Sequence, residues 1–261
     1  MKTKKIVIVD VDRGRVSYDL YEVRAVERLS HGEVVDDEAP EAVIDRLVAY
    51  FGPHAIVARH VPREIAGTAI PVGVSARHVH LSRAACDALF GAGYELARRH
   101  EVTQPGQYVT EETVDVIGPR GELDHVAIIN PLRAETQVEL ARTDAIHLGI
   151  DPPLRESGHL EATPGVRLRG PRGEVQLDHG AIIAQRHVHM SPEEALRLGV
   201  HDHDVIRVQA GGAREVMLGD VLVRISPDYA LDFHVDTDEA NAAGLVQDDT
   251  VTFAGIERGR D

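Results

Sequence analysis

The chain has 261 residues, enough for one large domain or two small ones, each with a hydrophobic core. Its formal net charge of −15 argues against non-specific binding to nucleic acid. No apolar run approaches the ~18 residues of a membrane span and no signal peptide is visible, so we expect a cytoplasmic protein without a membrane partner. The single cysteine, Cys86, excludes an intramolecular disulfide and leaves imidazole and carboxylate as the ligands for any metal.

Residues 1–69 differ in pattern from the rest of the chain. Segments 6–10 and 16–21 are predicted to pair as a hairpin, and segment 55–60 is a further candidate strand. Segment 40–51 places apolar residues on one face at helical spacing. We therefore predict an N-terminal extension of α/β or helical structure.

From residue 70 onward the sequence consists mainly of short strands separated by turns. The predicted strands are 114–117, 126–129, 137–140, 181–184, 205–209, 221–225 and 251–253. Short helices are predicted at 82–90 and 191–198, each with a serine N-cap, and at 238–243. This pattern indicates a mainly β fold with few helices.

Two internal echoes connect distant parts of the chain. VGVSARHVHLS at 72–82 resembles IIAQRHVHMS at 182–191, and GPRGELDHVAII at 118–129 resembles GPRGEVQLDHGAII at 170–183. The two echoes have different spacings, so they do not fit one tandem repeat. They favour two related modules with exchanged or permuted strands.

Each RHVH motif carries two histidines on one face of a predicted strand, because residues i and i+2 project to the same side. His78 and His80 form one pair, and His187 and His189 form the other. Zinc accepts imidazole nitrogen and, in catalytic sites, has three protein ligands and an open position. One isolated pair is equally well explained as a partly exposed strand edge, but the repeated context favours metal binding.

Each histidine pair needs a third ligand, for which Glu139 and His234 are candidates; spacing does not select them over the other acids and histidines. Arg133 and the motif arginines, Arg77 and Arg186, are candidates for an anion pocket, with surface ion pairs as the alternative. No P-loop, GxSxG or Cys-His nucleophile pattern is present.

Five segments together resemble a known family. They are PVGVSARHVHLS at 71–82, QPGQY at 104–108, PLRAETQVELARTD at 131–144, AQRHVHMSPEEA at 184–195 and HVDTDEANAAG at 234–244. In this order, across residues 70–253, they resemble the PduL-type phosphotransacylases, also called phosphate propanoyltransferases. The resemblance implies two small β-barrel domains with short helices, the first strand of one barrel being separated in sequence. The implied division is an extension at 1–69, a first barrel at 70–76 and 185–254, a second barrel at 77–184 and a tail at 255–261.

The resemblance also implies a set of site residues. One zinc ion would be bound by His78, His80 and Glu139, and a second by His187, His189 and His234. Arg133 would be the catalytic residue that faces phosphate. Ser75, Arg133 and Asn241 would bind substrate, with Ser75 and Asn241 at positions associated with coenzyme A.

The implied reaction converts a short-chain acyl-CoA, propanoyl-CoA or acetyl-CoA, and phosphate into acyl phosphate and CoA. The resemblance adds a role in propanediol degradation and location inside a bacterial microcompartment, with shell proteins and further copies of the chain as candidate partners. Segment 40–51 would then be a targeting helix, or alternatively a helix packed within its own appendage. Two other functions stay open, namely a metal-dependent hydrolase of thioesters or phosphate esters, and a zinc-stabilised interaction module.

Overall fold

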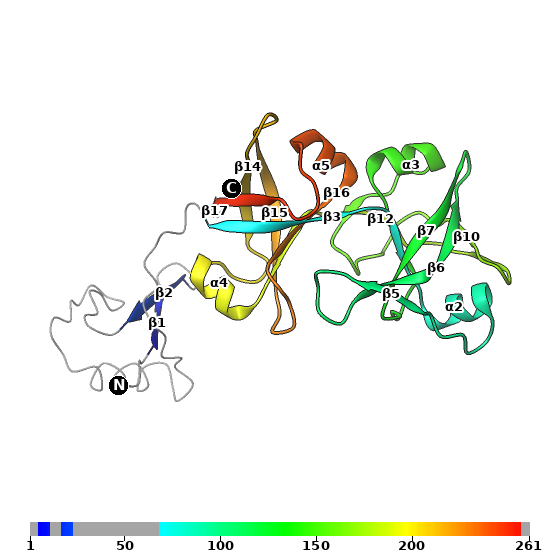
Figure 1. The fold of residues 1–261 in the computed structure, drawn as a ribbon, viewed down its shortest axis with the longest axis horizontal. Helices are drawn as coiled ribbons and strands as arrows, with labels where there is room; N and C mark the ends of the chain where they lie inside the picture. The colour runs from blue at the N-terminus through cyan, green and yellow to red at the C-terminus, as the bar shows by residue number, and fades with distance from the viewer. Residues whose placement is uncertain (1–4, 11–16, 23–67, 257–261) are drawn as a thin grey trace.

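The computed structural model describes residues 5–10, 17–22 and 68–256 (Figure 1). Strands β1 (Lys5–Asp10) and β2 (Ser17–Glu22) pair antiparallel, which confirms the predicted hairpin. The helix predicted at 40–51 and the strand predicted at 55–60 lie outside the described residues. None of the helices in the described ranges has the length and apolar character needed to cross a membrane.

A closed six-stranded barrel forms one module, which we call the barrel module. In barrel order its strands are β13 (His187–Met190), β15 (Val216–Ile225), β14 (Val205–Ala210), β17 (Thr250–Ile256), β3 (Ala69–Ser75) and β16 (Asp232–Asp236). It carries the helices α4 (Pro192–Leu198) and α5 (Thr237–Ala243). Its core is apolar and includes Val188 and Phe233, both fully buried.

A curled nine-stranded sheet forms the second module, the sheet module (Figure 1). Its strands run in the order β11 (Glu174–Gln176), β10 (Arg167–Arg169), β6 (Tyr108–Ile117), β7 (Glu122–Asn130), β4 (His78–His80), β8 (Gln137–Glu139), β12 (Ala181–Ala184) and β9 (Leu154–Arg155), with β5 (Arg98–Glu101) paired to β6. Its helices are α2 (Arg83–Phe90) and α3 (Arg142–Leu148). The predicted mainly β fold is confirmed; one module closes into a barrel, whereas the end strands β9 and β11 leave the other open.

The two modules exchange strands with each other. Strand β3 pairs parallel with β16 of the barrel, yet after two intervening residues the chain enters β4 of the sheet module. Strand β12 pairs parallel with β8 of the sheet module, and after two intervening residues the chain enters β13 of the barrel. Each RHVH motif therefore begins at a crossing between modules. The exchange explains why the echoes do not form a tandem repeat, and it brings both motifs to the junction.

Local signals fix most helix starts. The Ser82 hydroxyl accepts from the Ala85 N–H at 3.2 Å, and the Ser191 hydroxyl accepts from the Glu194 N–H at 3.3 Å, as the two predicted serine caps require. Helix α3 is absent from the sequence prediction because its N-cap is Ala141, which has no capping side chain. There the cap comes from within the helix, since the Asp144 carboxylate accepts from the Ala141 N–H at 3.2 Å.

The GPRG sequence forms a turn in both of its copies, and each turn donates a hydrogen bond to a carbonyl at the C-terminal end of a helix. The Arg120 N–H donates to the carbonyl of Leu148 at the end of α3, and the Arg172 N–H donates to that of Leu89 near the end of α2, both at 3.0 Å. A Cβ at Gly118 would lie 2.3 Å from the Leu148 carbonyl oxygen, so the turn requires glycine for this close approach.

Candidate active site between the two modules

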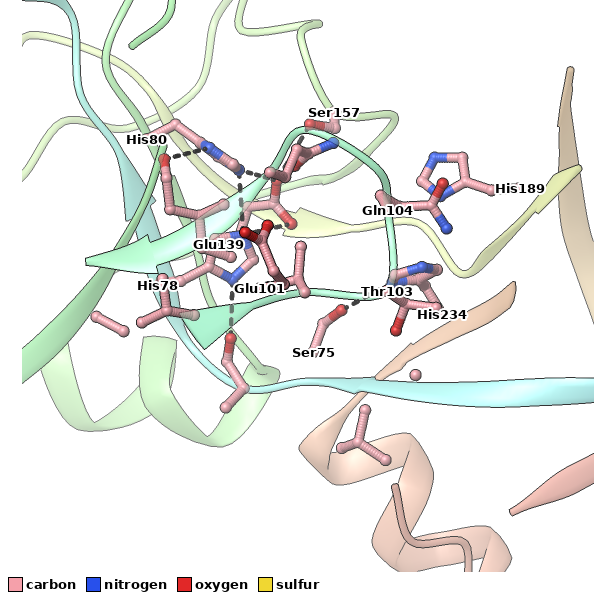
Figure 2. A pocket seen from close by; sticks show the side chains of 18 of the residues that line it. Ser75, His78, His80, Glu101, Thr103, Gln104, Glu139, Ser157, His189 and His234 are labelled. Atoms are coloured by element: carbon pink, nitrogen blue, oxygen red, sulfur yellow. Dashed lines mark hydrogen bonds and ion pairs between the residues drawn. The ribbon is translucent and has the colours of Figure 1, made fainter. Parts of the chain in front are cut away.

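A cavity of about 790 Å³ lies between the modules, and both contribute to its walls. Its lining includes eight of the nine predicted site residues, namely Ser75, His78, His80, Arg133, Glu139, His187, His189 and His234. Figure 2 shows His78, His80 and Glu139 on one side of this pocket and His189 and His234 on the other. The ninth, Asn241, is exposed on α5 and lies outside this lining; its carbonyl accepts from Arg214.

The sheet module contributes His78, His80 and Glu139, which we call the glutamate cluster. Strands β4 and β8 pair antiparallel with His78 directly opposite Glu139. The Nε2 atoms of His78 and His80 lie 3.5 and 3.6 Å from the Glu139 carboxylate oxygens. Val79, between the two histidines, faces the apolar core and is fully buried. Strand alternation thus sends the valine inward and both imidazoles to the cavity.

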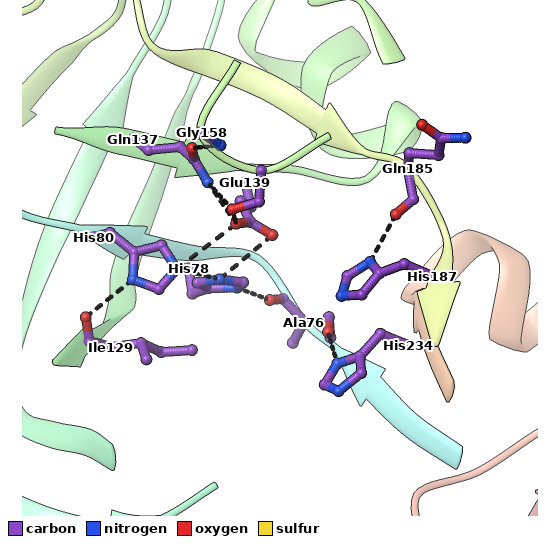
Figure 3. A network of polar contacts seen from close by, with 12 residues as sticks. Ala76, His78, His80, Ile129, Gln137, Glu139, Gly158, Gln185, His187 and His234 are labelled. Carbon is purple, nitrogen blue, oxygen red and sulfur yellow. Dashed lines mark hydrogen bonds and ion pairs between the residues drawn. The ribbon is translucent and has the colours of Figure 1, made fainter. Parts of the chain in front are cut away.

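Hydrogen bonds fix the tautomers of the glutamate cluster (Figure 3). Nδ1 of His78 lies 2.9 Å from the Ala76 carbonyl, and Nδ1 of His80 lies 3.2 Å from the Ile129 carbonyl. A carbonyl only accepts, so each Nδ1 carries a proton and each Nε2 is the ring nitrogen that faces the cluster. These two Nε2 atoms are 3.2 Å apart. At that separation the two Nε2 atoms can share one proton or one cation beside the Glu139 carboxylate.

Glu139 is held by neighbouring polar groups. Gln137 donates to its Oε1, and the Ser157 hydroxyl donates to the same oxygen at 3.1 Å. Ser157 in turn accepts from Nη1 of Arg133 at 2.9 Å, and the Gly158 N–H donates to the Gln137 side chain at 2.8 Å. The third residue of the cluster and the predicted phosphate residue therefore share one hydroxyl.

The electrostatics of the glutamate cluster keep its carboxylate charged. Burial raises the pKa of Glu139, but the two histidines outweigh it and hold that pKa well below its ordinary value. Burial lowers the pKa of His78, but Glu139 outweighs this and the net shift is upward. Burial lowers the pKa of His80 to about 4. The cluster is thus a buried donor set around a charged carboxylate.

The barrel module contributes His187, His189 and His234, which we call the histidine cluster. Strands β13 and β16 pair antiparallel with His187 directly opposite His234, and their rings stack with centroids 5.0 Å apart. Nδ1 of His187 donates to the Gln185 carbonyl at 2.8 Å (Figure 3), so its Nε2 presents a lone pair. The candidate ligand atoms of the three histidines lie within 4.8 Å of one another.

Burial keeps His187 and His189 of this second cluster neutral near pH 7. It lowers the pKa of His187 to about 4 and that of His189 further, with the neighbouring histidines acting in the same direction. Nearby, Asp232 is fully buried, and Oδ2 of its carboxylate lies 3.1 Å from Nε2 of His234. That contact lacks hydrogen-bond geometry, and within the described residues neither oxygen of Asp232 has a hydrogen-bond partner.

Both donor sets fit a divalent metal. Two histidines with a glutamate, and three histidines, are donor combinations of catalytic zinc sites. Zinc–ligand bonds of about 2.0–2.1 Å at tetrahedral angles separate neighbouring ligand atoms by about 3.3 Å. The separations of 3.2, 3.5 and 3.6 Å within the glutamate cluster are close to that value.

The arginines of the site divide into two kinds. The motif arginines form the alternative ion pairs, Arg77 with Asp144 at 3.3 Å and Arg186 with Glu239 at 2.9 Å. Arg77 nevertheless lines the cavity, and so do Arg133 and an arginine that sequence reasoning missed, Arg224 on β15. Two further residues were missed, Ser157 and Asp232. Only Arg224 had a signal in the sequence, because it is a charged residue within the otherwise apolar predicted strand 221–225.

Two three-donor clusters and a half-buried arginine around one cavity define a site suited to metal-assisted chemistry on an anionic substrate. The model of the phosphate propanoyltransferase family matches residues 71–246. The chain belongs to the phosphate propanoyltransferase family, and is an acyltransferase of that kind.

Several curated relatives carry the name phosphate propanoyltransferase. The protein of Thermotoga maritima is 52% identical over 183 residues, which cover 70% of this chain and 87% of the relative. That of Salmonella typhimurium is 48% identical over 187 residues, 71% of this chain and 89% of the relative. That of Rhodobacter capsulatus is 43% identical over 209 residues, 80% of this chain and 95% of the relative.

Proposed function

We propose that the chain interconverts propanoyl-CoA and phosphate with propanoyl phosphate and CoA, that acetyl-CoA is a second substrate, and that the reaction depends on two zinc ions. The observation that carries the proposal is the convergence of the glutamate cluster, the histidine cluster and Arg133 on one cavity. The names of the relatives supply the acyl group and the phosphate acceptor.

In this proposal the chain's own residues bind and orient the reactants. His78, His80 and Glu139 would hold one zinc ion, and His187, His189 and His234 the other. When bound, zinc supplies a Lewis acid that neutralises charge on oxygen. The Arg133 guanidinium, fixed by Ser157, binds phosphate oxygens through its fork of donors. A phosphate oxygen then bonds to the acyl carbon, the carbon–sulfur bond breaks and the thiolate takes up a proton. Alignment of the reactants in one cavity lowers the barrier.

Release of free thiol from propanoyl-CoA tests the reaction. The proposal expects release only when phosphate is present; release that proceeds without phosphate would instead indicate a hydrolase. The Ser75 hydroxyl lies 3.3 Å from Nδ1 of His234, so Ser75 is the alternative nucleophile. A stoichiometric burst of thiol without phosphate would indicate an acyl-enzyme on this route in place of direct attack by phosphate. Acetyl-CoA lacks one methylene and should differ by about 1 to 3 kcal/mol in specificity.

Metal removal separates the enzyme from a zinc-stabilised interaction module. The apolar cores of both modules exclude the six candidate ligands, so each core can persist without metal. We expect a chelator to abolish turnover while circular dichroism keeps its native signal, and added zinc to restore turnover. Unfolding on chelation would indicate structural metal sites.

The N-terminal residues are the basis of a separate proposal on location. The family match begins at residue 71, so residues 1–70 lie outside it. We propose that they direct the enzyme into a bacterial microcompartment through shell proteins, for use in propanediol degradation, and that the chain forms homo-oligomers. Deletion of residues 1–65 should abolish co-assembly with shell proteins and leave turnover intact; unchanged co-assembly would eliminate the targeting role. Light scattering gives the oligomeric state.

A further inference from the structure

Arg133 and Arg224 reach the cavity from opposite modules. Arg133 lies in the sheet module just before β8 and lines the cavity on that side. Arg224 lies on β15 of the barrel module, where its backbone is in register with His189. The Arg224 side chain is 25% exposed, so it is partly buried while still open to the cavity. The cavity therefore has a cationic side chain on each wall.

One short segment of the sheet module contacts both arginines. The Glu156 carboxylate lies 3.2 Å from Nε of Arg224, and the next residue, Ser157, accepts from Nη1 of Arg133 at 2.9 Å. A guanidinium has five N–H donors in a planar fork, and the contact with Glu156 is made through Nε. The other donors of Arg224 thus stay available for a second anion.

The two guanidinium charges influence each other. Burial lowers the pKa of Arg133, and the positive charge of Arg224 lowers it further. Arg224 also opposes protonation of His187 and His189. Like charges held in a partly buried cavity repel, and an oxyanion with several negative oxygens between them removes that repulsion.

We propose that Arg224 is a second phosphoryl-binding residue, which together with Arg133 holds the phosphate that attacks the thioester, or the phosphoryl group of the acyl phosphate in reverse. The inference rests on the proposed phosphate-dependent acyl transfer and adds a binding residue from the barrel module. A phosphoryl group has enough oxygens to meet a guanidinium on each side. Coenzyme A also carries phosphoryl groups, and the test below separates the two.

The primary test is Arg224→Gln in the full-length, metal-loaded enzyme. Loss of a charged hydrogen bond should raise the KM for phosphate about 10- to 100-fold and leave the KM for propanoyl-CoA within about threefold. Arg224→Lys keeps the charge without the fork and should recover part of the loss. Arg197→Gln, on the exposed face of α4, is the matched control and should change neither constant.

A second variant separates binding from the ion pair between the modules. Glu156→Gln removes the same ion pair and keeps the Arg224 charge, so we expect a KM for phosphate within about threefold of wild type. Phosphate alone should raise the melting temperature of wild type and Glu156→Gln, and raise it less in Arg224→Gln, because ligand binding to the folded state stabilises it. This second measurement requires no turnover.

The outcomes are distinguishable. If the wild-type enzyme shows no phosphate-dependent thiol release, the proposed function itself fails. If it does, an Arg224→Gln variant with an unchanged KM for phosphate overturns the role of Arg224. An increase in the KM for propanoyl-CoA instead would assign Arg224 to the coenzyme and overturn the proposal, as would equal effects of Glu156→Gln and Arg224→Gln.

Discussion

The glutamate cluster and the histidine cluster occupy equivalent places in two copies of one backbone plan. In each copy the HVH strand pairs parallel with the second strand of a hairpin, β7 or β15, and antiparallel with a short strand, β8 or β16. The first histidine lies directly opposite the third candidate ligand in both. In both copies the motif arginine pairs with an acidic residue in the first turn of the helix that follows this short strand, α3 after β8 and α5 after β16. The repeated register places the donors, and only the identity of the third donor differs.

That difference changes where each cluster has its carboxylate group. Glu139 belongs to its cluster directly, and the two histidines keep its pKa low. The histidine cluster has His234 at the equivalent position and Asp232 two residues earlier, fully buried beside the His234 ring. A carboxylate buried without a hydrogen-bond partner is costly. Asp232 therefore has a compensating role if it accepts the proton of Nε2 and balances a cation at the cluster.

The largest expected effect comes from breaking either cluster alone. We expect His78→Ala and His187→Ala each to remove one zinc equivalent per chain and to lower kcat by at least about 100-fold, since each leaves only two protein donors. Metal content by mass spectrometry after gel filtration, paired with thiol release, gives both readouts. His147→Ala, exposed at the end of α3, is the control. Full turnover in a variant that has lost its metal would contradict a catalytic role.

A smaller effect would sharpen the difference between the clusters. Asp232→Asn should weaken metal binding about 10- to 100-fold at the histidine cluster, because removal of a carboxylate behind a ligating histidine loosens both its orientation and its basicity. Competition with a chelator measures the affinity, and the glutamate cluster serves as the internal reference. Asp228→Asn, on the exposed loop before β16, is the matched control.

The same variant also reports on the cost of the buried carboxylate. If Asp232 has no part in metal binding, its replacement by a neutral isostere should raise the melting temperature and leave metal affinity unchanged. That combination would contradict the compensating role and identify Asp232 as a buried carboxyl group that costs stability.

Sequence alone predicted the parts of the site that depend on local spacing. Strand alternation indicated that His78 and His80 share a face, and serine caps indicated where α2 and α4 begin. The third candidate ligands came from family resemblance, because register between strands distant in sequence leaves no local pattern. Arg224 reaches the cavity through its pairing with β13, a long-range register of the same kind.

Ser157 shows a second limit of prediction from sequence. It lies in a segment between β9 and β10 that has no regular period, so no pattern indicates that its hydroxyl meets Glu139. The strand exchange was anticipated from the echoes only in general terms, because two copies with unequal spacing do not specify which strand pairs with which module. Which strand pairs with which module depends on where its apolar face is buried, and the apolar faces are buried in two separate cores.

The smallest expected effect comes from removing the Ser157 hydroxyl, and it is confined to the glutamate cluster. Ser157 accepts from Arg133 and Gln137 and donates to Glu139, so its single proton and both lone pairs are used. Ser157→Ala should raise the KM for phosphate about 3- to 10-fold, because the lost hydroxyl positions Arg133 without itself binding phosphate and such an indirect effect should not exceed the net value of an ordinary hydrogen bond. Ser157→Thr keeps the hydroxyl and should recover most of the loss. We expect zinc at the histidine cluster to be retained in both variants, because Ser157 contacts only the glutamate side; a loss of metal from both clusters would show that they do not act as separate sites.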